Sequence, residues 1–248
     1  MNAPRFQLLK LFGIAVVTVT LAIAGKMIWD YMGSPNGPAL FRWATGRESH
    51  RSSLVTIQRE RCEGAPFILP ADGFIGLLYN DPNGPYSKAA PHQGIDIFSN
   101  ADPGITPVYA AYDGFITRET EWRSTLIQRV PDDPLNPGTQ VWLYYTHMAD
   151  EQGNDFIEES FQPGTRELFV KQGTLLGYTG DYNGDSLRDV WVHLHFSIVK
   201  DDGRGQYTNE LEFANTIDPS PYLGLPLNYN CGAQPVQCGV DISQCTVP

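Results

Sequence analysis

Four of the five histidines in this chain fall in three short motifs with the residue types of a metal site. The motifs are His92-Gln93-Gly94-Ile95-Asp96, Tyr144-Tyr145-Thr146-His147-Met148 and His193-Leu194-His195-Phe196-Ser197. Imidazoles and a carboxylate are the ligands of a catalytic zinc ion, which binds three protein groups and keeps a fourth position for water. Because histidine is rare here, the grouping predicts a metal site.

The motif around His193 is expected to be a β-strand. Side chains at alternate strand positions leave the same face, so His193, His195 and Ser197 would line one face. Leu194 and Phe196 would then enter the core. Two imidazoles at such positions lie about 7 Å apart along the strand. One of them can therefore bind a metal while the other reaches the water or the substrate.

His92 and Asp96 add a second imidazole and a carboxylate, a combination that binds zinc well. Gly94 lies between them and allows the backbone to turn closely. His147 is expected at the end of a further strand. Each of these residues alone also fits an ordinary loop or strand-end position, so the prediction depends on their combination.

Strand signals dominate the rest of the chain and predict an all-β fold. Its 248 residues suffice for one well-cored domain with appendages, and 24 glycines and 19 prolines favour strands and turns over helices. We expect an antiparallel β-sheet or sandwich core with long polar loops at 131–138 and 151–164. Strands are expected at 95–98, 107–111, 115–117, 139–147 and 193–199 and, after a tight turn, within 171–180.

Residues 1–32 are expected to be a transmembrane anchor or a signal segment. The almost entirely apolar span Leu11–Trp29 follows Arg5 and Lys10. Its length suits a short or tilted transmembrane helix, which needs about 17–25 residues. A cut after Ala24 would make the segment a cleaved signal instead. We favour the anchor, and both alternatives give the rest of the chain an extracytoplasmic location with the positive end left inside.

The remaining chain divides by composition. We expect a polar stalk over 33–66, with His50 as a solvated loop residue, the folded domain over 67–225 and a cysteine-containing tail over 226–248. The net charge of −11 argues against nucleic acid as a partner, because such binding would need a basic face.

The four cysteines, Cys62, Cys231, Cys238 and Cys245, would meet an oxidising compartment beyond the membrane. An even number permits two disulfides, with three connectivities open. A second metal site is the alternative, but six residues separate each pair of neighbours among the last three, unlike the short zinc-binding clips. A tail stapled by disulfides fits better.

Together the three motifs resemble the lysostaphin-like (LytM-type) zinc endopeptidases, which cut peptidoglycan peptides. That family has H-x3-D, then a strand ending in Y-x-H, then H-x-H, and this chain has them in the same order across most of the expected domain. The resemblance implies that His92, Asp96 and His195 hold one zinc ion. It also implies that His193 and His147 are the catalytic pair. His193 can take the proton of zinc-activated water and pass it to the leaving amine, and His147 can orient the water or stabilise the tetrahedral oxyanion.

Two other features of the chain bear on substrate binding. Tyr86, six residues before His92, is a candidate donor to the oxyanion or a substrate contact, although a loop tyrosine usually only packs. The segment 181–192 is longer and more acidic than the Gly/Ser/Thr-rich loop usual there, which leaves the substrate choice open. A calcium loop in this segment is an alternative, but Ser186 and Val192 replace the expected glycine and glutamate.

Two other functions stay open. A lysostaphin-like domain without activity could regulate or scaffold other cell-wall hydrolases, although all five key positions are present here. A zinc D-alanyl-D-alanine peptidase also ends in H-x-H, but its upstream histidine and aspartate are spaced more widely than H-x3-D.

Overall fold

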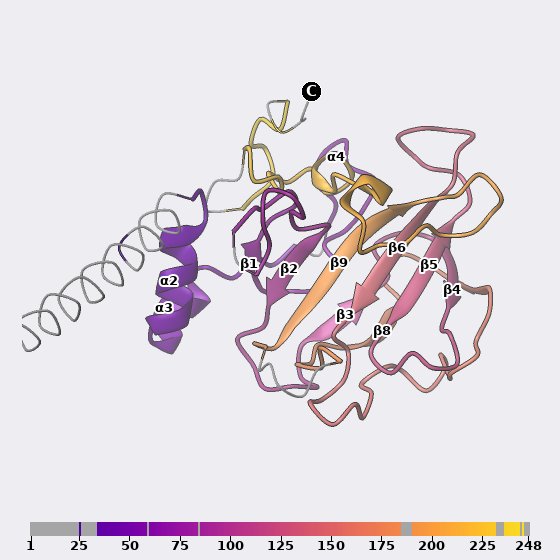
Figure 1. The fold of residues 1–248 in the computed structure, drawn as a ribbon, viewed down its shortest axis with the longest axis horizontal. Helices are drawn as coiled ribbons and strands as arrows, with labels where there is room; N and C mark the ends of the chain where they lie inside the picture. Colours follow the sequence, from indigo (N-terminus) through magenta and orange to yellow (C-terminus); the bar gives the residue numbers. More distant parts are fainter. Residues whose placement is uncertain are drawn as a thin grey trace, which may run out of the picture.

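A long antiparallel sheet forms the centre of the protein (Figure 1). The computed structural model describes residues 25, 34–58, 60–83, 85–184, 190–231, 236–243 and 245. The strands of this sheet are β1 (Phe74–Leu77), β2 (Ile95–Phe98), β4 (Gly114–Thr117), β5 (Leu126–Val130), β6 (Val141–Thr146), β7 (Leu168–Val170), β9 (His193–Lys200) and β10 (Thr216–Ile217). Their order is β1-β2-β9-β6-β5-β4-β7, and the short β10 also pairs with β9.

A smaller sheet supplies a second layer. Its strands are β3 (Pro107–Tyr109) and β8 (Leu175–Tyr178), and its buried residues Val108 and Leu176 join the hydrophobic cluster of the large sheet. The described helices are short: α2 (Gly37–Thr45), α3 (Glu48–Ser52), the 3-10 helix η1 (Phe213–Asn215) and α4 (Ser220–Leu223). Every pairing between the described strands is antiparallel. The prediction of an all-β, antiparallel core is therefore confirmed for this part of the chain.

The expected strands correspond to β2, β3, β4, β6, β8 and β9. The sequence patterns did not predict β1, β5, β7 or β10. In β5 the neighbours Leu126 and Ile127 are both buried, because the strand is covered on both faces. Such a strand lacks the alternation of apolar and polar residues that makes a half-exposed strand easy to predict.

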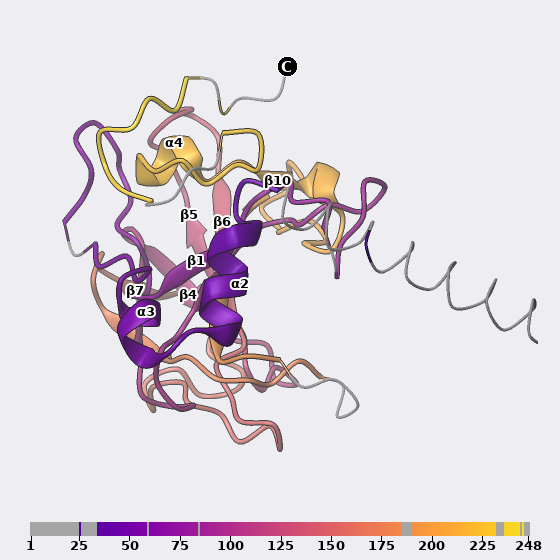
Figure 2. The same ribbon diagram turned by 90° about the vertical axis from the view of Figure 1, so that its left-hand side faces the viewer.

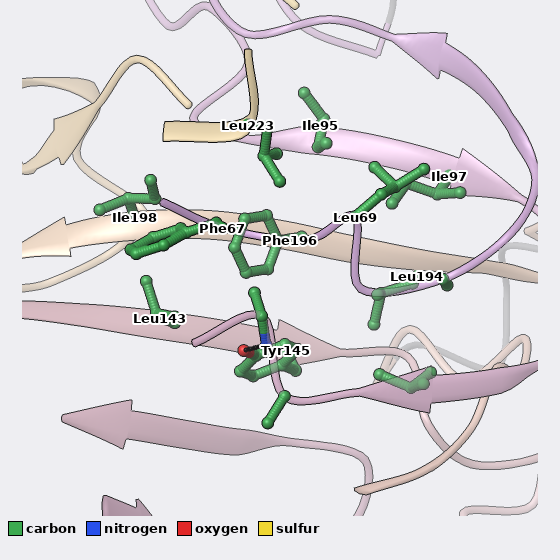
Figure 3. Packing of buried hydrophobic residues seen from close by; sticks show 14 of the residues in the cluster. Phe67, Leu69, Ile95, Ile97, Leu143, Tyr145, Leu194, Phe196, Ile198 and Leu223 are labelled. Carbon is green, nitrogen blue, oxygen red and sulfur yellow. Dashed lines mark hydrogen bonds between the residues drawn. The ribbon is translucent and has the colours of Figure 1, made fainter. Parts of the chain in front are cut away.

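The main core lies on one face of β9 (Figure 3). Leu194, Phe196 and Ile198 are fully buried there, as the strand alternation predicts. The Phe196 ring meets that of Tyr145 in β6 at a centroid distance of 5.3 Å. Phe67, from the segment before β1, covers the same cluster. This close packing holds the other face of β9 rigidly.

The segment 33–66 differs from the expected polar stalk, because part of it is helical and packs on the domain. Figure 2 shows α2 and α3 lying beside β1. Trp43 of α2 is buried, and its ring stacks on Phe74 of β1 at 5.1 Å. The side-chain amide of Asn36 donates hydrogen bonds of 3.0 and 2.9 Å to two carbonyls of β1. The helical face is short and surrounded by polar residues, which explains why the sequence pattern did not reveal it.

One disulfide joins the tail to an earlier part of the chain, and a second closes a loop within the tail. Cys62 pairs with Cys238, and Cys231 with Cys245, so the two expected disulfides are confirmed and their connectivity is defined. Val236 of the tail is buried in the main hydrophobic cluster. Because every cysteine sulfur is bonded to another, the alternative of a cysteine metal site is wrong. Disulfides are typical of oxidising compartments and are consistent with an extracytoplasmic location.

The expected anchor or signal segment lies outside the described residues, apart from Gly25. Within the described part of the chain, no helix combines the length and the apolar character needed to cross a membrane.

Candidate metal and active site

The pairing of β2 and β6 with β9 brings the predicted site residues together. In the antiparallel register Asp96 lies opposite His195. Directly opposed residues point to the same face, so both side chains meet on the face of the sheet away from the main core. Thr146, the last residue of β6, pairs with His195 from the other side. His147 follows directly, which places it at the same end of the sheet.

The three predicted ligands form a compact group of donor atoms. Oδ1 of Asp96 lies 2.9 Å from Nδ1 of His195 and 3.3 Å from Nε2 of His92. The two imidazole nitrogens are 3.0 Å apart. Ligand atoms on a tetrahedral zinc ion, with bonds of about 2.0–2.1 Å, lie roughly 3.3 Å from one another. The donor triangle therefore fits zinc in size and chemistry, and these residues could hold a metal ion.

The donor group is buried, so its charges act strongly on one another. The side chains of His92, Asp96 and His195 are 0%, 7% and 9% exposed. Burial would raise the pKa of Asp96, but the imidazoles of His92 and His193 lower it well below its usual range. Burial would lower the pKa of His195, but Glu210 and Asp96 raise it to about 10. The carboxylate of Asp96 is therefore ionised and faces the protonated imidazole of His195. A metal cation can take the place of the imidazole proton in such an arrangement.

Gly94 is required by close packing beside this group. A Cβ atom at this position would lie 2.4 Å from the carbonyl oxygen of Phe196 and 3.0 Å from Nε2 of His195. No side chain fits there without displacing the backbone of β9. Gly94 therefore allows the two strands to approach closely, and the chain bends there as expected.

His147 and His193 lie side by side next to the donor group. Their ring centroids are 4.1 Å apart, and Nε2 of His193 is 4.0 Å from Oδ1 of Asp96. His147 has a φ of 71°, a backbone conformation that non-glycine residues rarely adopt. Such strained conformations persist where the surrounding structure enforces them and are concentrated at functional sites. The backbone here holds the imidazole of His147 against that of His193.

A backbone carbonyl orients each ring of this pair. Nδ1 of His193 donates to the carbonyl of Trp191 at 2.6 Å, and Nδ1 of His147 donates to the carbonyl of Tyr182 at 2.5 Å. Since a carbonyl can only accept, each Nδ1 carries the hydrogen and each Nε2 is left as an acceptor. Burial lowers the pKa of both imidazoles, that of His147 to about 3. Both rings are therefore neutral at neutral pH, the state in which imidazole accepts a proton.

Tyr86 packs against a predicted ligand. Its ring stacks on His92 at a centroid distance of 4.3 Å. Burial, with nearby carboxylates, raises the pKa of the Tyr86 phenol, so the hydroxyl keeps its proton and can donate it in a hydrogen bond. A cavity of about 420 Å³ opens over the site, and its lining includes Tyr86, Tyr144, His147, Tyr182, His195 and Glu210. A larger hollow, of about 620 Å³, lies beside Lys200, and no histidine is among the described residues that line it.

Glu210 is a site residue that the sequence analysis missed. Its Oε1 lies 2.8 Å from Nε2 of His195 and accepts a 3.0 Å hydrogen bond from the hydroxyl of Ser197. It follows His195 by 15 residues and lies in an irregular segment between β9 and η1. No motif or periodic pattern marks it, because this segment reaches the site only in the folded chain.

Other candidates lie away from the site or outside the described residues. His50, the fifth histidine, is exposed as expected, but it lies in α3 rather than in a loop. Within the acidic segment 181–192, residues 185–189 are outside the described part of the chain. The calcium alternative therefore stays a prediction.

No protein-family model and no curated protein matches the chain, but solved structures do. Csd3 of Helicobacter pylori matches with a TM-score of 0.39 and 19% identity over 69% of this chain and 35% of Csd3. Lysostaphin matches with a TM-score of 0.39 and 20% identity over 60% of this chain and 49% of lysostaphin. A mutant catalytic domain of EnpA, a prophage-encoded M23 protein from Enterococcus faecalis, matches with a TM-score of 0.31 and 22% identity over 48% of this chain and 76% of that domain.

These neighbours include lysostaphin and an M23 protein. The chain spans about a third of Csd3 and half of lysostaphin. At these TM-scores and identities the matches carry no argument for an activity, which has to come from the site.

Proposed function

We propose that this protein is a zinc-dependent endopeptidase that hydrolyses peptide bonds in the stem or cross-bridge peptides of peptidoglycan. The observation that carries the proposal is the donor triangle of His92, Asp96 and His195, with the neutral pair His147 and His193 beside it. The motif resemblance supports the substrate class, and the disulfides are consistent with a location where peptidoglycan is found.

Hydrogen bonds prepare both imidazole ligands for a metal. Nδ1 of His92 donates to the carbonyl of Leu78 at 3.0 Å, which leaves Nε2 as the ligand atom. Nε2 of His195 points at Glu210, which leaves Nδ1 as the ligand atom. When bound, zinc supplies Lewis acidity and lowers the pKa of its water to about 7.

The two histidines would share the handling of the attacking water. Nε2 of His193 accepts the proton of the attacking water and returns it to the leaving amine, because its neutral ring has an acceptor at that atom. Nε2 of His147 is also an acceptor, so it fits the orientation of that water better than donation to an oxyanion. Donation to the developing oxyanion falls to the hydroxyl of Tyr86, which stays protonated.

A digest of purified peptidoglycan tests the proposal. The full chain should release peptide products that mass spectrometry identifies as cleaved within the stem or cross-bridge. A chelator should abolish the release, and added zinc should restore it. The variant His193→Ala is the matched control for contaminating hydrolases.

The other outcomes separate the alternatives. Release of a single terminal D-alanine would indicate a D-alanyl-D-alanine peptidase. A zinc-loaded protein that releases nothing would overturn the enzymatic proposal and favour a regulatory lysostaphin-like domain.

A further inference from the structure

Glu210 lies behind one of the proposed metal ligands, on the side away from the metal. Its carboxylate is 11% exposed and accepts from two groups of β9, Nε2 of His195 and the hydroxyl of Ser197. The nitrogen it binds is the one that faces away from the donor triangle. Glu210 is therefore not a fourth member of that triangle but acts on it through His195.

The two histidine ligands are supported differently. The outer nitrogen of His92 donates to a neutral backbone carbonyl, that of Leu78. The outer nitrogen of His195 faces a carboxylate. A carboxylate behind a metal-binding imidazole fixes the tautomer and the ring orientation, and it also makes the ligand nitrogen more basic. Among the described residues, a carboxylate is hydrogen-bonded to the outer nitrogen of His195 but not to that of His92.

Hydrogen bonds within the protein hold the segment around Glu210 in place. The side-chain amide of Gln93 donates to the carbonyl of Leu211 at 3.0 Å, which ties the segment to the motif that carries His92. Asn209 accepts a hydrogen bond from the backbone of Leu211 at 3.2 Å. The absence of a side chain at Gly94 leaves space beside Nε2 of His195, where a Cβ would come within 3.0 Å. These contacts fix the carboxylate at its distance from the imidazole.

The charges also favour a divalent cation. Asp96 and Glu210 bring two carboxylates to the buried site, and no lysine or arginine is among the described residues lining the cavity beside it. Buried carboxylates need compensation by a cation or by protonated partners. Two negative charges with two neutral imidazoles would balance one zinc ion.

We propose that Glu210 is a positioning residue that sets the zinc affinity of this site. It holds Nε2–H of His195 so that Nδ1 faces the metal, and it supplies the second negative charge. This inference assumes the zinc site of the proposed function, but it can fail independently of it.

Zinc titrations of the full chain test this role. The zinc dissociation constant is measured by competition with a chromophoric chelator for the wild type, Glu210→Gln and Glu210→Ala. Gln retains the shape and an acceptor oxygen but removes the charge, and Ala removes both. Glu212→Gln is the matched control, because Glu212 is exposed on the same segment and bonds to Asn209 and Asn215.

We expect Glu210→Gln to weaken zinc binding about 10-fold and Glu210→Ala up to about 100-fold, the usual range for partners of metal ligands. Glu212→Gln should bind zinc like the wild type. The visible absorption of the cobalt-substituted protein should change in both Glu210 variants, which a merely structural role would not require.

Zinc affinity in Glu210→Gln and Glu210→Ala equal to that of the wild type would overturn the inference while leaving the proposed function intact. If Glu210→Ala does not fold, Glu210→Gln alone decides. A wild-type chain that binds no zinc would instead overturn the proposed function.

Discussion

The two faces of β9 are both buried but chemically opposite. Leu194 and Phe196 on the core face are 0% exposed, and the side chains of His193 and His195 on the site face are 6% and 9% exposed. The core face needs only shape and apolar area. On the site face every polar group needs a defined partner, because an unpaired buried polar group costs about 1–3 kcal/mol. Burial therefore serves stability on one face and sets protonation states on the other.

The comparison predicts that substitutions on the site face will mainly lower turnover. Substitutions on the core face will mainly lower the free energy of unfolding. The largest effect is expected on the site face. His193→Ala should keep its zinc but lose turnover by about 100–10,000-fold, because the proton acceptor is removed. His147→Ala should behave similarly. Peptidoglycan digestion and metal analysis on the same samples check this. Loss of zinc in either variant would show that the substituted histidine is a metal ligand and not a catalytic residue.

The next effect is on the core face. Phe196→Ala should lower the free energy of unfolding by about 3–5 kcal/mol, because it empties a fully buried ring site next to Tyr145. Phe196→Leu, which removes fewer buried atoms and leaves a smaller cavity, should cost less than Phe196→Ala. Urea unfolding of zinc-free protein measures both without metal linkage. A loss below about 1 kcal/mol in Phe196→Ala would contradict the role given to this face.

A smaller effect tests whether α2 belongs to the folded unit. Trp43 is 3% exposed, and Phe41 on the same helix is 53% exposed. Trp43→Ala should cost about 3 kcal/mol of unfolding free energy, the low end for a buried aromatic, because α2 lies at the edge of the sheet. Phe41→Ala should change it by less than about 0.5 kcal/mol. If thermal unfolding showed equal effects of the two variants, α2 would not be part of the folded unit, and the prediction of a solvated stalk would stand.

The smallest expected effect is in the pH profile. Burial lowers the pKa of His193, so its neutral form persists below the ordinary imidazole value of about 6.5. As the pH falls, kcat/KM should therefore hold through about pH 6.5 and decline only at lower pH. Zinc content measured at each pH separates protonation of the base from loss of metal. A decline centred above about pH 6.5 with zinc still bound would contradict the assignment.

The sequence predicted the part of the site that local patterns encode. Strand alternation placed His193 and His195 on one face and Phe196 on the other, as the structure has them. The spacing of His92 and Asp96 around Gly94 predicted a close turn into a strand, which is also present. Their roles as ligands and catalysts stay predictions until metal and activity are measured.

Features that depend on tertiary contacts could not be predicted from patterns in the sequence. Glu210 reaches His195 from an irregular segment, so no spacing rule identifies it. The apolar side of α2 consists of only a few residues. The burial of Trp43 could not be predicted because it depends on the contact with Phe74, which lies far from it in the sequence. The pairing of Cys62 with Cys238 joins residues that are 176 positions apart, and connectivity is not encoded in cysteine spacing.

The zinc content of three purified proteins tests the central claim most directly. The wild type should carry about one zinc ion per chain, and His195→Ala should carry almost none, because one of three protein ligands is removed. His50→Ala, at an exposed histidine in α3, should carry as much as the wild type. Full zinc occupancy in His195→Ala would contradict the proposed metal site and the mechanism built on it.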